Sequence, residues 1–295
     1  SGKTMTAMSL IGLLPREAVV TGSIKFSGVE MVNRSERDLS ELRGSEIGTI
    51  FQDPLRALNP TMRVGKQVGE ALRLHNTVPK KDVKKRTVEL LDLVQLPDPA
   101  TLSRRYPHQL SGGQQQRVLI AMAIACDPKL LIADEPTTAL DVTVQKEILE
   151  LLARLSTERG MGVLFVSHDL GVIQAISDHV AVLYGGSLVE TGPTDRIVGS
   201  PRHRYTEALI SVNPGHPEDI AASLGKPLVT IKGSVPALGS FLPGCRFRGR
   251  CPHEVEQCAA EPAITELAGG HTFKCWNPVE STMSLSPEVA DLAEG

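Results

Sequence analysis

The side chains best suited to chemistry begin at the first residues of the chain. Ser1-Gly2-Lys3-Thr4 matches the end of a phosphate-binding loop of the pattern G-x-x-x-x-G-K-[ST]. Glycine lets backbone amides approach phosphate oxygens, Lys3 can place a positive charge on the β- and γ-phosphates, and the Thr4 hydroxyl can bind Mg²⁺. A helix expected over residues 5–14 would point its N-terminus at those phosphates. So short a motif is weak evidence by itself, and its weight depends on the rest of the chain.

A pair of carboxylates follows an apolar run in the middle of the chain. Residues 130–133 (LLIA) suit a strand buried on both faces, and Asp134 and Glu135 come directly after it. Ligands of open α/β sheets bind beyond the carboxyl ends of the strands, where Asp134 would lie. Asp134 can hold Mg²⁺, directly or through water, and Glu135 can polarise an attacking water. Without the phosphate-binding loop, a strand that ends in solvated acids before Pro136 would be an equally good interpretation.

Two further polar side chains end apolar runs. His168 follows residues 162–167 (GVLFVS), and Gln52 follows residues 48–51 (GTIF). In a parallel sheet the imidazole of His168 would lie near the γ-phosphate and could donate a hydrogen bond to developing charge. The amide of Gln52 could reach Mg²⁺ or water. Each residue taken alone would be an ordinary loop or strand-end residue.

The most specific motif is LSGGQ, which consists of Leu110, Ser111, Gly112, Gly113 and Gln114. Ser111 is a good N-cap residue, and the two glycines expose backbone amides at the start of a long helix. This helix start predicts a second anion-binding site, separate from the first. As plain structure it would be a capped helix with a flexible start. As a functional element it can bind the γ-phosphate of a nucleotide held by another subunit.

The patterns around these motifs predict the elements that position them. Residues 1–55 and about 126–200 alternate apolar runs with helical patterns, as a parallel α/β sheet does. A helical insertion between them is predicted from apolar residues at helical spacing, namely Val64, Val68, Leu72, Val88, Leu91 and Val94. From about Asn213 onward Pro and Gly are frequent, and long periodic segments are absent.

These changes in pattern divide the chain into two expected domains. The first covers residues 1–224 and includes the helical insertion as a subdomain at about 56–125. The second is a small C-terminal domain over residues 225–295, joined through residues 200–203 (SPRH).

Composition limits the classes of partner. The 295 residues carry a net charge of -3, whereas a nucleic-acid-binding domain usually has a basic excess. One basic run, residues 80–86 (KKDVKKR), could touch phosphates or lipid headgroups, although a solvated helix start is the favoured interpretation. No apolar stretch approaches the ~20 residues that span a bilayer, and no signal peptide is visible, so a membrane role would require partner subunits.

Four of the five cysteines lie close together near the end of the chain. Cys245, Cys251, Cys258 and Cys275 are spaced C-x5-C-x6-C-x16-C. In a chain without an export signal this clustering favours a metal site over disulfides. Four thiolates can surround Zn²⁺ or hold a [4Fe–4S] cluster, and four unligated buried thiols are the plainer alternative.

Together the motifs resemble those of ABC-transporter ATPases. Their order matches the Walker A end, the Q-loop, the signature, the Walker B motif with its catalytic glutamate and the switch histidine: Gly2-Lys3-Thr4, Gln52, LSGGQ, LLIADE and His168. Residues 139–141 (ALD) resemble the D-loop. Three further segments resemble the ATPase subunits of bacterial dipeptide/oligopeptide importers: residues 51–60, which include Phe51-Gln52-Asp53-Pro54, residues 200–209 and residues 244–252. The resemblance covers nearly the whole chain.

The resemblance implies a fold and a site. The fold would be α/β, a P-loop NTPase (RecA-like) core of ABC type with a helical subdomain, plus a small irregular Cys-rich C-terminal domain. Catalysis would depend on Glu135, His168 and Gln52, and Mg²⁺ would be held by Thr4, Gln52 and Asp134. ATP would be bound by residues 1–4, Gln52, Asp134 and Asp141, and by residues 110–114 of a partner. For the four cysteines the resemblance favours [4Fe–4S], with Zn²⁺ second.

The resemblance also implies partners and a location. A homologous ATPase subunit would form a head-to-tail dimer that sandwiches ATP, and two transmembrane permease subunits would receive its motion through the Q-loop region. A peptide-binding protein would act with them, and the chain would lie peripherally on the cytoplasmic face of the membrane. Three alternatives stand beside peptide import: an ATPase for nickel or another small solute, a soluble ABC ATPase outside transport, and a non-hydrolysing subunit that supplies only its signature motif.

The start of the sequence departs from this family. The upstream half of the phosphate-binding loop and the aromatic residue that usually stacks on adenine do not precede Gly2. As written, the chain is expected to bind ATP poorly at its own site, although its signature could serve a partner. Because Glu135 and His168 are intact, we interpret the site as truncated and not as degenerate.

Overall fold

The computed structural model describes residues 1–53, 57–138, 140–212, 230–237 and 239–280. Pro54, Ala139 and the change of pattern from Asn213 lie outside these ranges. The chain forms two compact units, one of Thr4–His168 and the other of Ser1–Lys3 with Asp169–Gly295, and each is described by itself. The expected boundary near residue 225 falls outside the described residues and stays a prediction.

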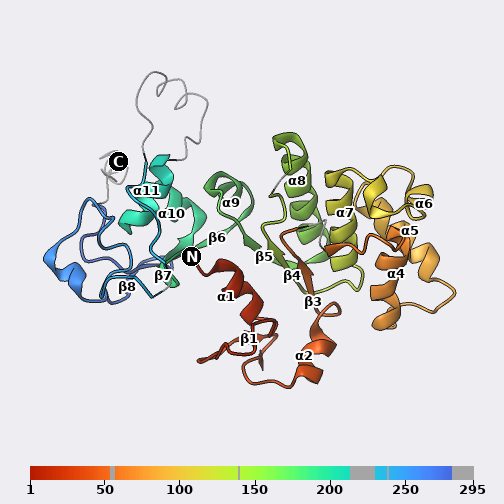
Figure 1. The fold of residues 1–295 in the computed structure, drawn as a ribbon, viewed down its shortest axis with the longest axis horizontal. Coiled ribbons are helices and arrows are strands. Elements are labelled where there is room, and N and C mark those ends of the chain that lie inside the picture. Colours follow the sequence, from red (N-terminus) through yellow and green to blue (C-terminus); the bar gives the residue numbers. More distant parts are fainter. Residues whose placement is uncertain (54–56, 139, 213–229, 238, 281–295) are drawn as a thin grey trace, which may run out of the picture. The chain divides into compact units, whose positions relative to one another are not determined.

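The unit of Thr4–His168 is built on a three-stranded parallel sheet (Figure 1). Its strands are β3 (Ile47–Ile50), β4 (Leu130–Asp134) and β5 (Gly162–Val166), in the order β3-β4-β5. In the register Ile50 pairs with Ala133, and Asp134 pairs with Val166. The carboxyl ends of all three strands therefore lie at one edge, where the sequence predicted a ligand.

The central strand β4 is buried on both faces, as its apolar run predicted, whereas the edge strand β5 is less buried than expected and its Leu164 is 37% exposed. Alternate residues of β4 pack into different clusters: Leu131 and Ala133 into one, Ile132 into the other. The smaller cluster contains residues of α1 (Lys3–Ser9) and α2 (Glu36–Leu42). A short hairpin of β1 (Lys25–Phe26) and β2 (Val29–Glu30) precedes α2.

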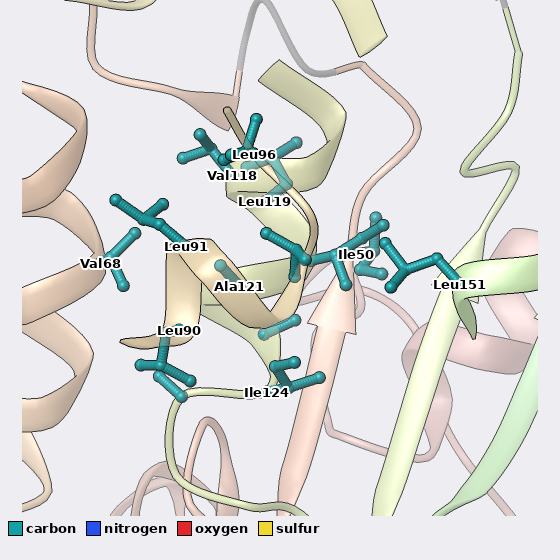
Figure 2. Packing of buried hydrophobic residues seen from close by; sticks show 14 of the residues in the cluster. Ile50, Val68, Leu90, Leu91, Leu96, Val118, Leu119, Ala121, Ile124 and Leu151 are labelled. Atoms are coloured by element: carbon teal, nitrogen blue, oxygen red, sulfur yellow. The ribbon is translucent and has the colours of Figure 1, made fainter. Parts of the chain in front are cut away.

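The larger cluster joins the sheet to the predicted helical insertion. Figure 2 shows Ile50 of β3 packed among apolar side chains of the surrounding helices. The helices of this region are α4 (Val64–Leu74), α5 (Val83–Leu93), α6 (Pro99–Leu102), a 3-10 turn (Pro107–Gln109), α7 (Gly112–Ala123) and α8 (Val142–Arg159). Val64, Val68, Leu72, Leu91 and Val94 are fully buried, and Val88 is half-buried. The helical spacing thus predicted the core-facing side of α4 and α5.

The first helix is shorter than predicted. It ends at Ser9 instead of residue 14, because the chain turns through Gly12 in the left-handed conformation, at a φ of 65°. The amide of Gly12 donates to the carbonyl of Ser9, and that of Leu13 to the carbonyl of Met8, which is a glycine-terminated helix end. A Cβ at residue 12 would lie 2.5 Å from Cδ1 of Leu39, so a larger residue would have to displace that side chain and would be strained at this φ.

The other unit contains a four-stranded antiparallel sheet of order β6-β7-β9-β8. Its strands are β6 (His179–Tyr184), β7 (Ser187–Pro193), β8 (Thr265–Leu267) and β9 (His271–Phe273). Helices α9 (Leu170–Ile176), α10 (Thr194–Gly199) and α11 (Arg204–Val212) and a 3-10 turn (Glu256–Ala259) complete it. Strands from the Cys-rich tail therefore share a sheet with β6 and β7. No described helix has the length and apolar character needed to cross a membrane.

A buried polar network ties the tail to this sheet. The carboxylate of Glu190, on β7, lies 2.7 Å from Nε2 of His271 on β9. It also accepts hydrogen bonds from the backbone amides of Arg202 and His203, at 2.6 and 3.0 Å. His203 is 1% exposed, and its Nδ1 accepts the amide of Tyr205 at 3.0 Å. Protonation of Nδ1 would break that bond inside an apolar environment, and burial lowers the pKa of His203 to about 4.

The stability of this unit is therefore expected to fall in acid. Because the folded pKa of His203 lies below the unfolded value, the stabilisation is full above the unfolded pKa and is lost as the pH falls through the folded one. Between pH 7 and pH 5 the loss should be about 2 kcal/mol. Fluorescence of the single tryptophan, Trp276, during urea unfolding would measure it. His203→Gln should remove most of this dependence and the exposed-site control His179→Gln should keep it; equal behaviour of the two variants would contradict the assignment.

Candidate nucleotide site

Two oxygen ligands suited to Mg²⁺ meet at the edge of the parallel sheet. Thr4, in the first turn of α1, donates its hydroxyl to Oδ1 of Asp134 at 3.2 Å. Asp134 is the last residue of β4 and only 3% exposed. Hydroxyl and carboxylate oxygens are hard ligands, and Mg²⁺ commonly takes one or two carboxylates together with phosphate oxygens of a substrate. The pair fits such an ion.

The Glu135 carboxylate contacts side chains that follow the other two strands of the sheet. Its Oε2 accepts hydrogen bonds from Nε2 of Gln52 at 2.8 Å and from the hydroxyl of Thr138 at 3.0 Å. Its Oε1 lies 3.2 Å from Nδ1 of His168. Gln52 follows β3, Glu135 follows β4 and His168 follows β5, so the parallel register brings together three residues that are far apart in the sequence.

The backbone at Glu135 is held in an uncommon conformation. Its φ is 48°, a left-handed value that costs a side-chain-bearing residue roughly 1 kcal/mol. Its amide donates to the carbonyl of Val166 at 2.9 Å, which extends the pairing of β4 and β5 by one residue. The turn directs the carboxylate toward Gln52 and His168. Strain of this kind is frequent where a side chain has to be placed for function.

The arrangement is suited to proton transfer at a water molecule. The Glu135 side chain is 16% exposed and His168 67%, so the carboxylate is sheltered while the imidazole faces solvent. A carboxylate fixed by an amide and a hydroxyl can accept a proton from water in a defined direction. The nearby imidazole can donate a hydrogen bond to a developing charge.

Thr138 was not predicted from the sequence. It lies three residues after Glu135, and its hydroxyl reaches back to the carboxylate. The only available signal was the pair of hydroxyl residues at positions 137 and 138 after Pro136, which is common in ordinary turns.

The LSGGQ motif forms the predicted capped helix start. The Ser111 hydroxyl accepts the amide of Gln114 at 3.3 Å, and the Gln114 side chain accepts the amide of Ser111 at 3.2 Å. This reciprocal capping box leaves the amides of Gly112 and Gly113 at the helix terminus. Asp141 caps α8 in a similar way, accepting the amide of Val144 at 3.0 Å. Leu110 is buried before this turn, and Ser1, Gly2 and Lys3 group with the other compact unit.

The four tail cysteines are shielded thiols near one another. Cys245 and Cys258 are buried, and the amide of Cys245 donates to the carbonyl of Cys258 at 3.0 Å. Burial raises the pKa of Cys245, Cys251 and Cys275, to about 11 for Cys251, and the neighbouring thiols raise each further. Within the described residues no three His, Cys, Asp or Glu side chains form a group that could hold a metal ion. As arranged, the thiols are close but do not converge on one ion.

These features define an ATPase of the P-loop class with a signature helix. Comparison with protein families agrees: residues 1–138 match the model of the ABC transporter family, and residues 189–258 match that of the oligopeptide/dipeptide transporter C-terminal region. Among solved structures, the ATP-binding cassette MJ0796, described as a dimer bound to ADP and Pi, has a TM-score of 0.57 at 28% identity, over 65% of this chain and 81% of that one. The protein cbiO1 of Clostridium perfringens has a TM-score of 0.58 at 29% identity, over 68% and 75%.

Curated relatives narrow the class. A peptide import ATP-binding protein of Brucella abortus is 46% identical over 93% of this chain and 82% of its own length. The oligopeptide transport ATP-binding protein OppD is 43% identical in Salmonella typhimurium, over 96% and 83%, and 42% identical in Escherichia coli, over 96% and 82%. The chain therefore belongs to the ATP-binding subunits of ABC-type peptide importers, and ATP hydrolysis is its enzymatic activity.

Proposed function

We propose that this chain hydrolyses ATP to power the import of dipeptides or oligopeptides through a membrane permease. The observation that carries the proposal is the meeting of Gln52, Glu135 and His168 beside the Thr4–Asp134 pair. That arrangement suits attack of water on a phosphate held at the start of α1. The identity of the solute, a peptide, is inferred from the names of the relatives, because the residues of this site do not select it.

Each residue then has a distinct task. Glu135 orients the attacking water and accepts its proton, and His168 donates a hydrogen bond to charge on the γ-phosphate. The side-chain amide of Gln52 holds the Glu135 carboxylate in position and would contact the metal ion and the attacking water. Lys3 and the amides of residues 1–4 bind phosphates of the subunit's own ATP. The amides of Gly112 and Gly113, in the signature 110–114, bind the γ-phosphate of a partner's ATP, and Asp141 lies next to that interface.

Thr4 and Asp134, with Gln52 nearby, would hold Mg²⁺ in this site. Bound there, the ion supplies positive charge that neutralises the β- and γ-phosphate oxygens. The chain's own contribution is to fix the two oxygens: the hydroxyl by the first turn of α1 and the carboxylate by its burial at the end of β4.

The assembly proposed is a head-to-tail pair of ATPase subunits beneath two transmembrane permease subunits, with a peptide-binding protein supplying the solute. It is supported by the dimeric state described for the structurally similar MJ0796 and by the transport names of the relatives. Peripheral attachment at the cytoplasmic face of the membrane follows from this assembly. Whether the second ATPase subunit is identical or a paralogue does not alter the roles above.

Transport in reconstituted vesicles would test the function. The subunit is assembled with its permease, and uptake of a labelled tripeptide is measured with ATP and with a non-hydrolysable analogue. ATP-dependent tripeptide uptake that the analogue does not support is the expected result. Stimulation of ATP hydrolysis by Ni²⁺ and its binding protein, without any by peptide, would instead favour the metal-solute alternative.

The tail is proposed to form a C-terminal domain, from about residue 225, in which Cys245, Cys251, Cys258 and Cys275 bind a [4Fe–4S] cluster, with Zn²⁺ as the alternative. The proposal is supported by the spacing of the four cysteines and by the backbone hydrogen bond that holds Cys245 against Cys258. A bound cation would favour the thiolate forms that burial now disfavours. Small movements of the tail would have to bring the four sulfur atoms to the cluster.

Metal analysis of protein purified without oxygen would distinguish a [4Fe–4S] cluster, bound Zn²⁺ and the absence of metal. We expect about four iron atoms and a broad absorbance band near ~400 nm, both lost in Cys251→Ser. Cys126→Ser is the matched control, since Cys126 lies in the other unit, and it should keep the iron. One zinc and no colour would support the alternative metal. Neither metal would show that the tail contains four unligated thiols.

A further inference from the structure

A cavity in the helical region is lined by six basic residues and no acidic one. Its volume is about 360 Å³, and it lies between α4, α5 and the segment after α6. The basic residues are Arg63, Lys66, Arg73, Lys80, Lys84 and Arg104. The remaining lining is neutral, namely Gly65, Val83, Thr87 and Ser103. The chain as a whole carries a net charge of -3, so this concentration of positive charge is local.

Backbone hydrogen bonds hold two walls of the cavity together, namely α4 and the segment after α6. The amides of Val64 and Gly65 donate to the carbonyls of Arg105 and Ser103, both at 2.9 Å. A Cβ on Gly65 would lie 2.7 Å from the Ser103 carbonyl oxygen, so the close approach requires glycine. These bonds bring Arg104 beside the first turn of α4, where Lys66 lies.

The third wall of the cavity, α5, is held against α4 by close packing. A Cβ on Gly69, on α4, would lie 3.1 Å from both Val83 and Thr87 of α5. Lys84 lies on α5 and Lys80 in the turn before it, while Lys66 and Arg73 are seven residues apart on α4. The guanidinium of Arg73 is fixed by a 3.1 Å hydrogen bond to the Lys66 carbonyl. Lys80 and Lys84 of the basic run near residue 80 are exposed to solvent, as predicted, and they also line this cavity beside other cations.

Ion pairs with described carboxylates do not account for these cations. In the described part of the chain, none of the six basic residues forms an ion pair, although Lys85 and Arg86 next to them both pair with Glu89. All six residues are exposed, so water weakens their mutual repulsion, and an anion held among them would reduce it further. A volume of about 360 Å³ is small for an extended acidic peptide or a nucleic acid.

We propose that this cavity binds a compact anion that carries two or more phosphate groups. Arginine guanidinium groups match phosphate geometry in pairs, and lysines add point charge. Six cations can neutralise at least two phosphates, and the volume is within the range of small-ligand sites. The phosphates could belong to a soluble molecule or to a diphosphate lipid headgroup, which share this chemistry.

Calorimetric titration with inorganic tripolyphosphate tests the proposal. The chain carries Lys3→Gln throughout, so that the phosphate-binding loop does not contribute. Lys84→Gln/Arg104→Gln removes two cavity cations, and Lys85→Gln/Arg105→Gln removes their chain neighbours, which do not line the cavity. We expect the first pair to weaken binding by about tenfold or more and the second by less than about twofold.

Flotation with phosphatidylcholine vesicles, with or without cardiolipin, separates the two sources of phosphate. Binding to tripolyphosphate alone assigns a soluble ligand, and cardiolipin-dependent flotation that needs Lys84 and Arg104 assigns a headgroup. Equal effects of the two variant pairs, or no binding of either probe, would overturn the proposal. So would displacement of tripolyphosphate by a poly-glutamate peptide at equal or lower concentration, because the cavity would then prefer an acidic protein segment.

Discussion

Replacing Glu135 with glutamine is expected to slow ATP hydrolysis by the subunit about 10²- to 10⁴-fold while ATP binding remains. Glutamine has the same size and can still accept a hydrogen bond from Gln52 or Thr138, which now contact the carboxylate at 2.8 and 3.0 Å. Its backbone is no more strained than that of glutamate at a φ of 48°. What it loses is the ability to accept a proton from water. The defect should therefore appear in the rate and not in folding or in nucleotide affinity.

Phosphate release and retention of labelled ATP would be measured side by side for this variant. Glu150→Gln is the matched control, since Glu150 is an exposed carboxylate on α8 that only pairs with Lys146 at 3.8 Å. It should keep full activity. A Glu135→Gln protein that still hydrolyses ATP at more than about a tenth of the normal rate would rule out Glu135 as the base.

The parallel core and its site residues were predictable because simple rules apply to them. Buried strands in a parallel sheet are continuous apolar runs, and their carboxyl ends share one edge. Residues 52, 134, 135 and 168 each follow such a run, so their meeting could be inferred before any distance was known. The Ser111 cap could be inferred for the same reason, because hydroxyl side chains close helix starts locally.

Other features depend on contacts that no local pattern encodes. The early end of α1 at Ser9 accompanies a left-handed turn at Gly12, which packs against Leu39, a residue of another helix. The pairing of β9 with β7 joins segments about eighty residues apart through Glu190 and His271. Strands of three residues are too short to show alternation, so β8 and β9 could not be predicted. The basic cavity likewise exists only once α4 and α5 pack.

Replacing Gly112 with aspartate is expected to preserve the stability of the signature helix while impairing ATP hydrolysis. The position is exposed, and a Cβ there would lie 3.6 Å from Leu140, which is ordinary contact. An acidic residue in the first turn of α7 interacts favourably with the helix dipole, so the free energy of unfolding should hold or rise by about 0.3–1 kcal/mol. At Gly113, by contrast, a Cβ would lie 2.7 Å from Val144 and the packing itself would suffer.

The same carboxylate would occupy the place proposed for the partner's γ-phosphate. Two anions cannot share that helix start, so ATP hydrolysis by the dimer should fall at least about 100-fold. Gly112→Asn introduces a side chain of the same size without the charge, and this variant should lose much less of its ATP hydrolysis rate. Urea unfolding and phosphate release measured on both variants separate the causes. If aspartate and asparagine impair hydrolysis equally, the signature acts through its shape alone; if aspartate unfolds the helix, Gly112 is needed for folding and not for phosphate binding.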